Sequence, residues 1–200
     1  MLYRKVNKSE YRIISEIHLA AFDGFFLTSL GKRFLNTYYK SCLKSNESIA
    51  VCAVDNEDKI TGFSFGSLLS KGFHKRIVKQ NILLFLSRGM IILLTRPAAL
   101  LRLANNLDKN ANKADDGNYA ELLSIAVLPS AKGTGIGKEL IKNFEIEAIR
   151  KGCKKIALTT DYYNNDDVLE FYKRSGYKVF YEFTAYPDRK MYKLIKDITE

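Results

Sequence analysis

The sequence predicts an α/β layered fold, because segments with strand and helix patterns alternate along the chain. With 200 residues and 46% hydrophobic composition, the chain can bury a sizeable core, and we expect a single domain over residues 1–200. It has only three prolines and no long polar tract, which argues against a linker. The predicted elements, in order, are a strand at 2–6, helices near 9–21 and 28–44, strands at 48–54, 60–69 and 119–127, a helix at 135–151, a strand at 155–160, a helix at 165–175, and strands at 177–186 and 190–195.

The N-terminal segment and the cysteines predict the cellular compartment of the protein. Residues 2–6 form a short alternating pattern, as in a strand that begins directly after Met1. The sequence does not start with the basic residues and apolar stretch of a signal peptide. The three cysteines, Cys42, Cys52 and Cys153, are odd in number and lack the spacing of metal ligands. We therefore expect a cytoplasmic protein with reduced thiols and no bound metal.

A glycine-rich loop between a strand and a helix is the most informative motif. Residues 125–140 contain an apolar strand run, a turn at Pro129, glycines at 133, 135 and 137, and a helix start. Glycines allow turn conformations and let a ligand approach the main chain. The N–H groups and the dipole of the helix start favour an anion at this place. The order predicts a phosphate cradle, with an ordinary strand–turn–helix connection as the alternative.

Two other phosphate-binding loops do not fit this segment. A P-loop needs a hydroxyl residue after its lysine, whereas Lys138 is followed by Glu139. A dinucleotide fingerprint needs Gly-x-Gly-x-x-Gly, and these glycines fall at Gly-x-Gly-x-Gly. The loop instead resembles the acetyl-CoA loop of the GNAT acetyltransferases, Gln/Arg-x-x-Gly-x-Gly/Ala with a strand valine five residues earlier. The matching residues are Val127, Lys132, Gly135 and Gly137, with Lys132 in place of the usual Gln or Arg.

A second segment, residues 165–177, resembles the other GNAT signature, Asn-x-x-Ala-x-x-x-Tyr followed by Gly-Phe/Tyr. Asn165 and Tyr172 are seven residues apart and so lie on one face of a helix, about two turns apart. Val168 stands where Ala is usual, and Gly176 suits the helix exit. Because both signatures occur in order, the chain resembles the GNAT N-acetyltransferases over most of its length.

This resemblance implies a fold and a co-substrate. In the GNAT fold a mixed, mostly antiparallel central sheet is flanked by helices, and its fourth and fifth strands splay apart around the thioester arm of acetyl-CoA. We expect the backbone of Ile125, Ala126 and Val127 to bond the pantetheine amides as an added strand would, and Asn165 to orient that arm or the phenol of Tyr172. The amides expected to hold the pyrophosphate belong to Lys132, Gly133, Thr134, Gly135, Ile136, Gly137 and Lys138.

The resemblance also implies direct attack of an amine on the acetyl thioester, with a base for the amine and an acid for the leaving thiolate. Glu121 is the expected base, because it lies at the position of the general-base glutamate in histone-type members of the family, although many members use another residue or water. Regular strand alternation would put it on the same face as Val127. A solvated strand-end glutamate is the alternative. Tyr172 is the expected acid, since a phenol stays protonated at neutral pH, and a core aromatic is the alternative. His18 and His74 are expected to have structural or solvent roles.

An insert of residues 70–118 lies between the third and fourth strands, where the family usually has a short turn. Residues 70–113 contain nine Lys or Arg and one acid, so this stretch carries +8 of the chain's net charge of +10. Helices are expected on both sides of Pro97. Its apolar runs, 82–86 and 90–94, are far shorter than the roughly 20 residues that span a bilayer.

Three roles for this basic helical insert stay open. It is a cap over the sheet or against a second subunit of a homodimer, a site for an anionic acceptor such as a nucleotide-linked amino sugar, or a contact with an anionic membrane surface. The sequence argues against nucleic acid, because aromatic and basic residues rarely interleave in the insert.

The segment 21–31 lies between the first two helices, where GNAT enzymes often build the acceptor wall. Phe22, Phe25 and Phe26 would line it and Asp23 would meet an ammonium, unless the segment is a hydrophobic staple before a helix capped by Thr28. The predicted function is therefore transfer of acetyl from acetyl-CoA to a primary amine of a small molecule, with an amino sugar as one candidate. A protein lysine or N-terminal acceptor and a non-catalytic acyl-CoA-binding domain are the alternatives.

Overall fold

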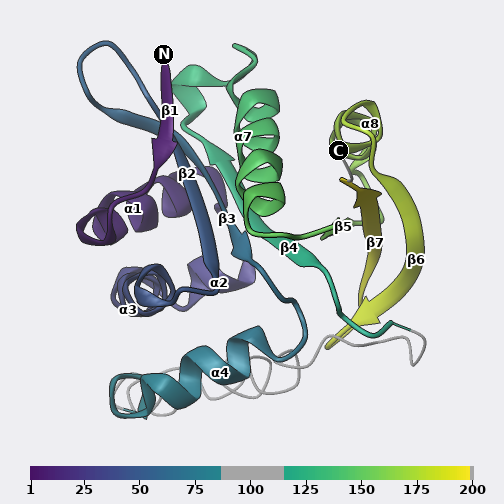
Figure 1. The fold of residues 1–200 in the computed structure, drawn as a ribbon, viewed down its shortest axis with the longest axis horizontal. Coiled ribbons are helices and arrows are strands. Elements are labelled where there is room, and N and C mark those ends of the chain that lie inside the picture. The colour runs from purple at the N-terminus through teal and green to yellow at the C-terminus, as the bar shows by residue number, and fades with distance from the viewer. Residues whose placement is uncertain (87–114, 199–200) are drawn as a thin grey trace.

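The computed structural model describes residues 1–86 and 115–198. Its centre is a seven-stranded sheet in the order β1-β2-β3-β4-β5-β7-β6 (Figure 1). Neighbouring strands are antiparallel except for the parallel pair β4 and β5, which confirms the predicted mixed, mostly antiparallel sheet. The strands are β1 Leu2–Lys5, β2 Ser48–Val54, β3 Ile60–Ser67, β4 Ala120–Val127, β5 Lys155–Asp161, β6 Lys178–Ala185 and β7 Arg189–Asp197.

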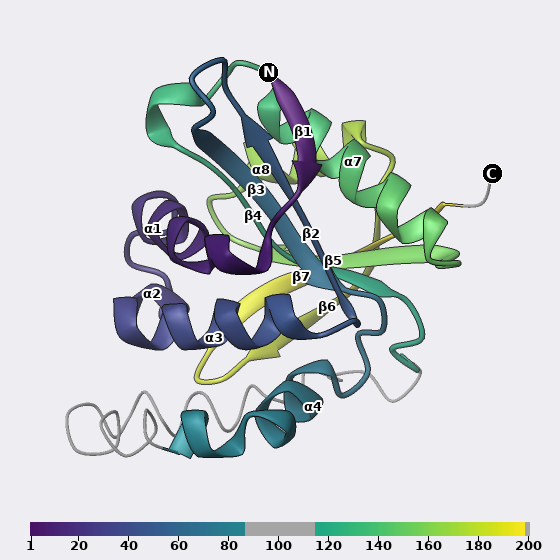
Figure 2. The same cartoon turned by 60° about the vertical axis from the view of Figure 1, so that its left-hand side comes forward.

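Helices cover both faces of the sheet. The helices α1 (Tyr11–Ala21) and α3 (Lys32–Lys44) lie on one side of β2 and β3, and α7 (Ile136–Arg150) lies on the other (Figure 2). The predicted helix 28–44 is divided into α2 (Phe26–Ser29) and α3, because Gly31 between them has a φ of 86° that is incompatible with a continuous helix. The remaining helices are α4 Phe73–Gln80, α8 Asp166–Arg174 and the short 3-10 turns Lys8–Glu10 and Pro129–Ala131.

A bulge in β4 changes which face its first residues occupy. In the pairing with β3, Leu123 is an extra residue between the paired positions Leu122 and Ser124. One extra residue interrupts the alternation of strand side chains, so residues before and after it exchange faces. Glu121 therefore shares a face with Ser124 and not with Val127. The predicted common face of Glu121 and Val127 is wrong for this reason.

The parallel strands β4 and β5 separate after a short paired stretch. The paired positions run only from Ala120 with Ile156 to Leu122 with Leu158, although β4 continues to Val127. The separation is the expected splay of the fourth and fifth strands. The β4 backbone beyond Leu122 therefore has an edge that β5 does not occupy.

The described part of the insert begins with α4, which packs on the α3 side of the molecule. Phe73 and Ile77 of α4 are buried, and the hydroxyl of Tyr38 lies 3.2 Å from Nε2 of His74. The helices predicted on both sides of Pro97 fall outside the described residues. Among the described helices, none has the length and apolar character needed to cross a bilayer.

Candidate active site

A cavity of about 820 Å³ lies where β4 and β5 diverge. Its walls combine the end of α1, the segment leading into α2, β4, the glycine-rich loop, α8, the end of β5 and the start of β7. The cavity wall, as far as the chain is described, includes neither Thr134 nor Glu121. The other predicted site residues all line it: Ile125, Ala126, Val127, Lys132, Gly133, Gly135, Ile136, Gly137, Lys138, Asn165 and Tyr172.

The glycine-rich loop presents open backbone at the start of α7. Gly133 and Gly135 have φ values of 79° and 83°, a left-handed conformation that favours glycine. A Cβ added to either would meet nothing within 4 Å, so the space beside the loop is free for a ligand. The hydroxyl of Thr134 instead donates to the carbonyl of Ala131 at 2.7 Å and braces the loop. The loop and the positive end of α7 together suit an anion.

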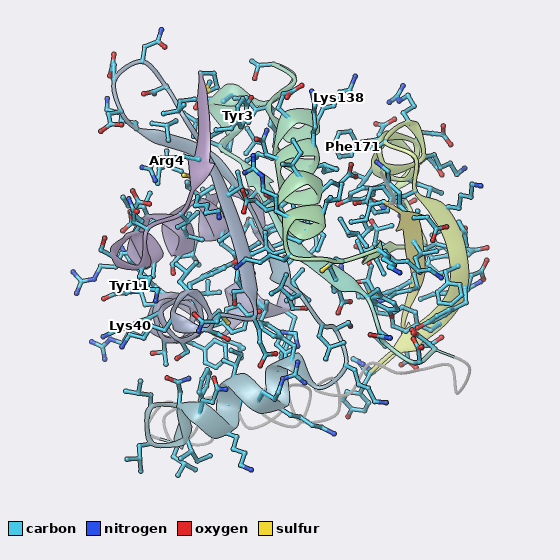
Figure 3. The ribbon with its side chains drawn as sticks, viewed as in Figure 1. Tyr3, Arg4, Tyr11, Lys40, Lys138 and Phe171 are labelled. Atoms are coloured by element: carbon cyan, nitrogen blue, oxygen red, sulfur yellow. The ribbon has the colours of Figure 1, made fainter. Side chains whose placement is uncertain are left out.

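The other side of this loop faces α8. A Cβ added to Gly137 would lie 3.6 Å from Cζ of Phe171, an ordinary van der Waals distance, so α7 and α8 lie close together here. Figure 3 shows Phe171 extending from α8 toward α7, with Lys138 at the first turn of α7. Lys138 and Lys132 both line the cavity and add positive charge beside the open backbone.

Tyr172 and Asn165 stand at opposite ends of α8 and both line the cavity. Burial raises the pKa of Tyr172 to about 12, so the phenol keeps its proton at neutral pH. The Asn165 amide donates to the Thr160 hydroxyl at 2.6 Å and to the Asp161 carbonyl at 3.0 Å. These bonds fix the start of α8 to the end of β5 and thereby set the position of Tyr172.

Glu121 lies in a buried ion pair. Its side chain accepts from the ammonium of Lys193 at 2.6 Å and from the hydroxyl of Ser70 at 2.5 Å. Glu121 is 8% exposed and Lys193 is 4% exposed, which excludes the solvated strand-end alternative. Its role as a base stays a prediction, and the ion pair gives the carboxylate a second role in joining β4, β7 and the start of the insert.

The end of the cavity near α1 and α2 is aromatic, and sequence reasoning found only part of it. Phe22, Phe25 and Phe26 line the cavity as predicted. An adjoining hollow of about 380 Å³ is lined by Asp23, Gly24, Phe25, Phe26, Asp161 and Arg189. Arg189 donates through Nε to Asp161 at 2.5 Å, and its guanidinium lies 5.1 Å from the ring centre of Phe25. Arg189 and Asp161 belong to no local motif, because only the pairing of β5 with β7 brings them together.

His18 is another residue of the cavity that the sequence pattern did not select. It was expected to have a structural or solvent role, but it lines the cavity near the aromatic end. Its ring centre lies 4.6 Å from that of Phe22, four residues later on the same helix face. The sequence did contain a signal for this position, because His18 lies one helical turn before Phe22, a residue predicted to line the acceptor wall.

The family follows from a sequence comparison. A family model described as Acetyltransferase (GNAT) family matches residues 13–177. The chain belongs to the GNAT acetyltransferase family. A search of the curated proteins finds no match to this GNAT chain. In the described residues, no group of three His, Cys, Asp or Glu side chains is placed to hold a metal ion.

Several solved GNAT structures share the fold. An aminoglycoside 6'-N-acetyltransferase complexed with coenzyme A is 16% identical with a TM-score of 0.63, covering 100% of this chain and 98% of that one. The ribosomal-protein-S18-alanine N-acetyltransferase from Escherichia coli is 11% identical with a TM-score of 0.59, covering 100% and 94%. A spermidine N-acetyltransferase chimera from Vibrio cholerae is 13% identical with a TM-score of 0.59, covering 98% and 95%. At these identities the likeness shows the fold alone.

Proposed function

We propose that this GNAT protein transfers the acetyl group of acetyl-CoA to a primary amine of a small molecule. The observation that carries the proposal is one continuous cavity with three chemically distinct parts. The open loop at the start of α7 suits the pyrophosphate, the free edge of β4 suits the pantetheine amides, and the aromatic end suits the acceptor. The aminoglycoside enzyme of the same fold, solved with coenzyme A, supports this co-substrate.

The chemistry that this arrangement supports is direct transfer. The amine nitrogen attacks the thioester carbonyl carbon, a C–N bond forms and the C–S bond breaks. The thiolate that leaves takes its proton from Tyr172, which lines the cavity and is protonated at neutral pH. The attacking amine is in its neutral form, and the proton that its nitrogen loses on becoming an amide passes through solvent to the Tyr172 phenolate, which restores the phenol. Both carboxylate oxygens of Glu121 already accept hydrogen bonds, so we propose that it acts chiefly by holding Lys193 and Ser70. The alternative role of Glu121 as a base is separable by the pH profile of its Gln variant.

The aromatic end favours an acceptor that carries a positive charge and some apolar surface. Phe22 and Phe25 offer ring faces, and Asp23 offers a carboxylate at the adjoining hollow. Amino sugars and other small amines belong to this class. A protein N-terminus or lysine is the alternative acceptor, and the fold likeness to the S18-alanine enzyme favours keeping it in the test.

The insert is a separate matter from the transfer site. Of its basic side chains, Lys71, Lys75, Arg76 and Lys79 lie in the described part of the chain. Arg76 pairs with Glu47 at 2.6 Å and so fastens α4 to the body of the molecule. We propose a structural cap as its role. Light scattering tests the homodimer, and sedimentation with anionic vesicles tests the membrane contact.

The function is tested by following the release of CoA thiol from acetyl-CoA with panels of amino sugars, polyamines and peptides. Turnover with a small amine supports the proposal, and turnover with peptides alone moves the acceptor to the protein class. Tight binding of CoA with no turnover on any panel would make the protein a non-catalytic acyl-CoA-binding domain.

A further inference from the structure

The buried face of α1 carries an imidazole with one nitrogen that lacks a partner. His18 is 3% exposed, and its Nδ1 lies 2.8 Å from the hydroxyl of Tyr39 on α3. Its Nε2 is buried and, within the described structure, makes no hydrogen bond. The same side chain lines the cavity beside the aromatic end. His18 thus combines an unpartnered ring nitrogen with a place in the wall of the cavity.

Burying this nitrogen without a partner is unfavourable, because it loses its hydrogen bonds to water and gains none in the protein. The Tyr39 bond already occupies Nδ1, and the ring of Phe22, 4.6 Å away, offers no hydrogen-bonding atom. A molecule in the cavity is therefore the natural partner for Nε2. Resting on the proposed function, we propose that Nε2 of His18 accepts a hydrogen bond from the amine of the acceptor substrate and orients it for attack.

The neighbours of His18 can hold it in the form that this role needs. Nδ1 of His18 lies 2.8 Å from the hydroxyl of Tyr39, and either group can donate this hydrogen bond. When Nδ1 donates to Tyr39, Nε2 keeps its lone pair and is an acceptor. When Tyr39 donates to Nδ1, Nε2 carries the hydrogen and is a donor, which does not match an N–H group. The proposed contact therefore requires the tautomer with hydrogen on Nδ1.

The charge state of His18 is compatible with an amine. Burial lowers the pKa of His18 to about 4, so the ring is neutral at physiological pH. The groups that the structure places against it, Phe22 after α1 and Tyr39 of α3, are uncharged side chains. A neutral acceptor does not repel a substrate that arrives as an ammonium. Once that ammonium has lost a proton, the neutral amine held through one N–H keeps its lone pair free to attack the thioester.

Two matched variants separate this contact from packing. His18→Asn places an amide near the level of Nδ1, keeps a partner for Tyr39 and removes Nε2. His18→Gln extends its amide toward the place of Nε2. We expect the Asn variant to lose about 10-fold or more in kcat/KM for the amine, mainly through KM, and the Gln variant to stay within about threefold of wild type. Calorimetry should give unchanged CoA affinity for both.

Equal losses in the two variants, or a parallel loss of CoA affinity, would assign His18 to packing alone and overturn the proposal. A readout that does not need turnover is the nitrogen NMR spectrum of the imidazole in the wild-type protein. We expect the tautomer with hydrogen on Nδ1 and no protonation from about pH 6 to about pH 8. A hydrogen on Nε2 would refute the proposed contact of His18 with the substrate, even if the protein acetylates amines. An acetylation panel with no product would refute the proposed function and leave the imidazole spectrum unchanged.

Discussion

Substituting Glu121 by Gln tests whether the buried ion pair is structural. The carboxylate and the Lys193 ammonium lie 2.6 Å apart, and their side chains are 10% and 5% exposed. The amide has nearly the same shape as the carboxylate, so the substitution removes the charge with little change of packing. Lys193 is then left as a buried ammonium without its counter-charge, which costs about 3–5 kcal/mol. If the cost is about 3 kcal/mol, we expect Tm to fall by about 6–12 °C for a chain of this length.

Urea unfolding followed by circular dichroism measures the loss. An exposed control is Glu57→Gln, whose partner Lys59 has a side chain that is 72% exposed, and we expect no measurable change there. The double variant Glu121→Gln with Lys193→Gln should recover part of the loss, because it leaves no unpaired charge. A loss below about 1 kcal/mol in Glu121→Gln would refute the structural assignment. If turnover also falls and the fall narrows at high pH, Glu121 acts as the base as well.

Three further predictions concern the cavity. Gly135→Asp should abolish CoA binding in calorimetry, because it adds a carboxylate beside the anion site. Gly152→Asp should not, although Gly152 has a similar φ of 80° with equally open space at the far end of α7, and equal losses would contradict the pyrophosphate assignment. Tyr172→Phe should lower kcat by about 10²-fold in the thiol assay with CoA affinity unchanged, and an unchanged kcat would exclude Tyr172 as the acid. Because the His18 pKa is lowered to about 4 in the folded state, the unfolded chain binds more protons below pH 6.5, and stability should fall by about 3 kcal/mol as the pH drops from about 6.5 to 4. Urea unfolding across this range should show a smaller fall for His18→Gln, and an equal fall would contradict the assignment to His18.

Local information in the sequence determined most of the elements and most of the residues proposed to hold the co-substrate. The loop around Gly133 and Gly135 was predictable because the left-handed conformations belong to glycine itself. Asn165 and Tyr172 were predictable because Asn165 caps α8 and Tyr172 lies near its other end, so helical spacing relates the two positions. Helix and strand bounds agreed for a similar reason, with two exceptions. Gly31 divided a predicted helix, and α4 lies where no helix was predicted.

Tertiary structure decided the rest, because those features depend on partners far apart in the chain. Leu123 forms a bulge only in its pairing with β3, and that bulge moved Glu121 to the other face and into contact with Lys193 of β7. The orphan nitrogen of His18 likewise exists only because Tyr39, on another helix, takes the first nitrogen while the fold buries the second. Periodicity along a chain reports which side chains share a face, but register between strands and the hydrogen-bond partners of buried polar atoms are set by the packing of separate elements.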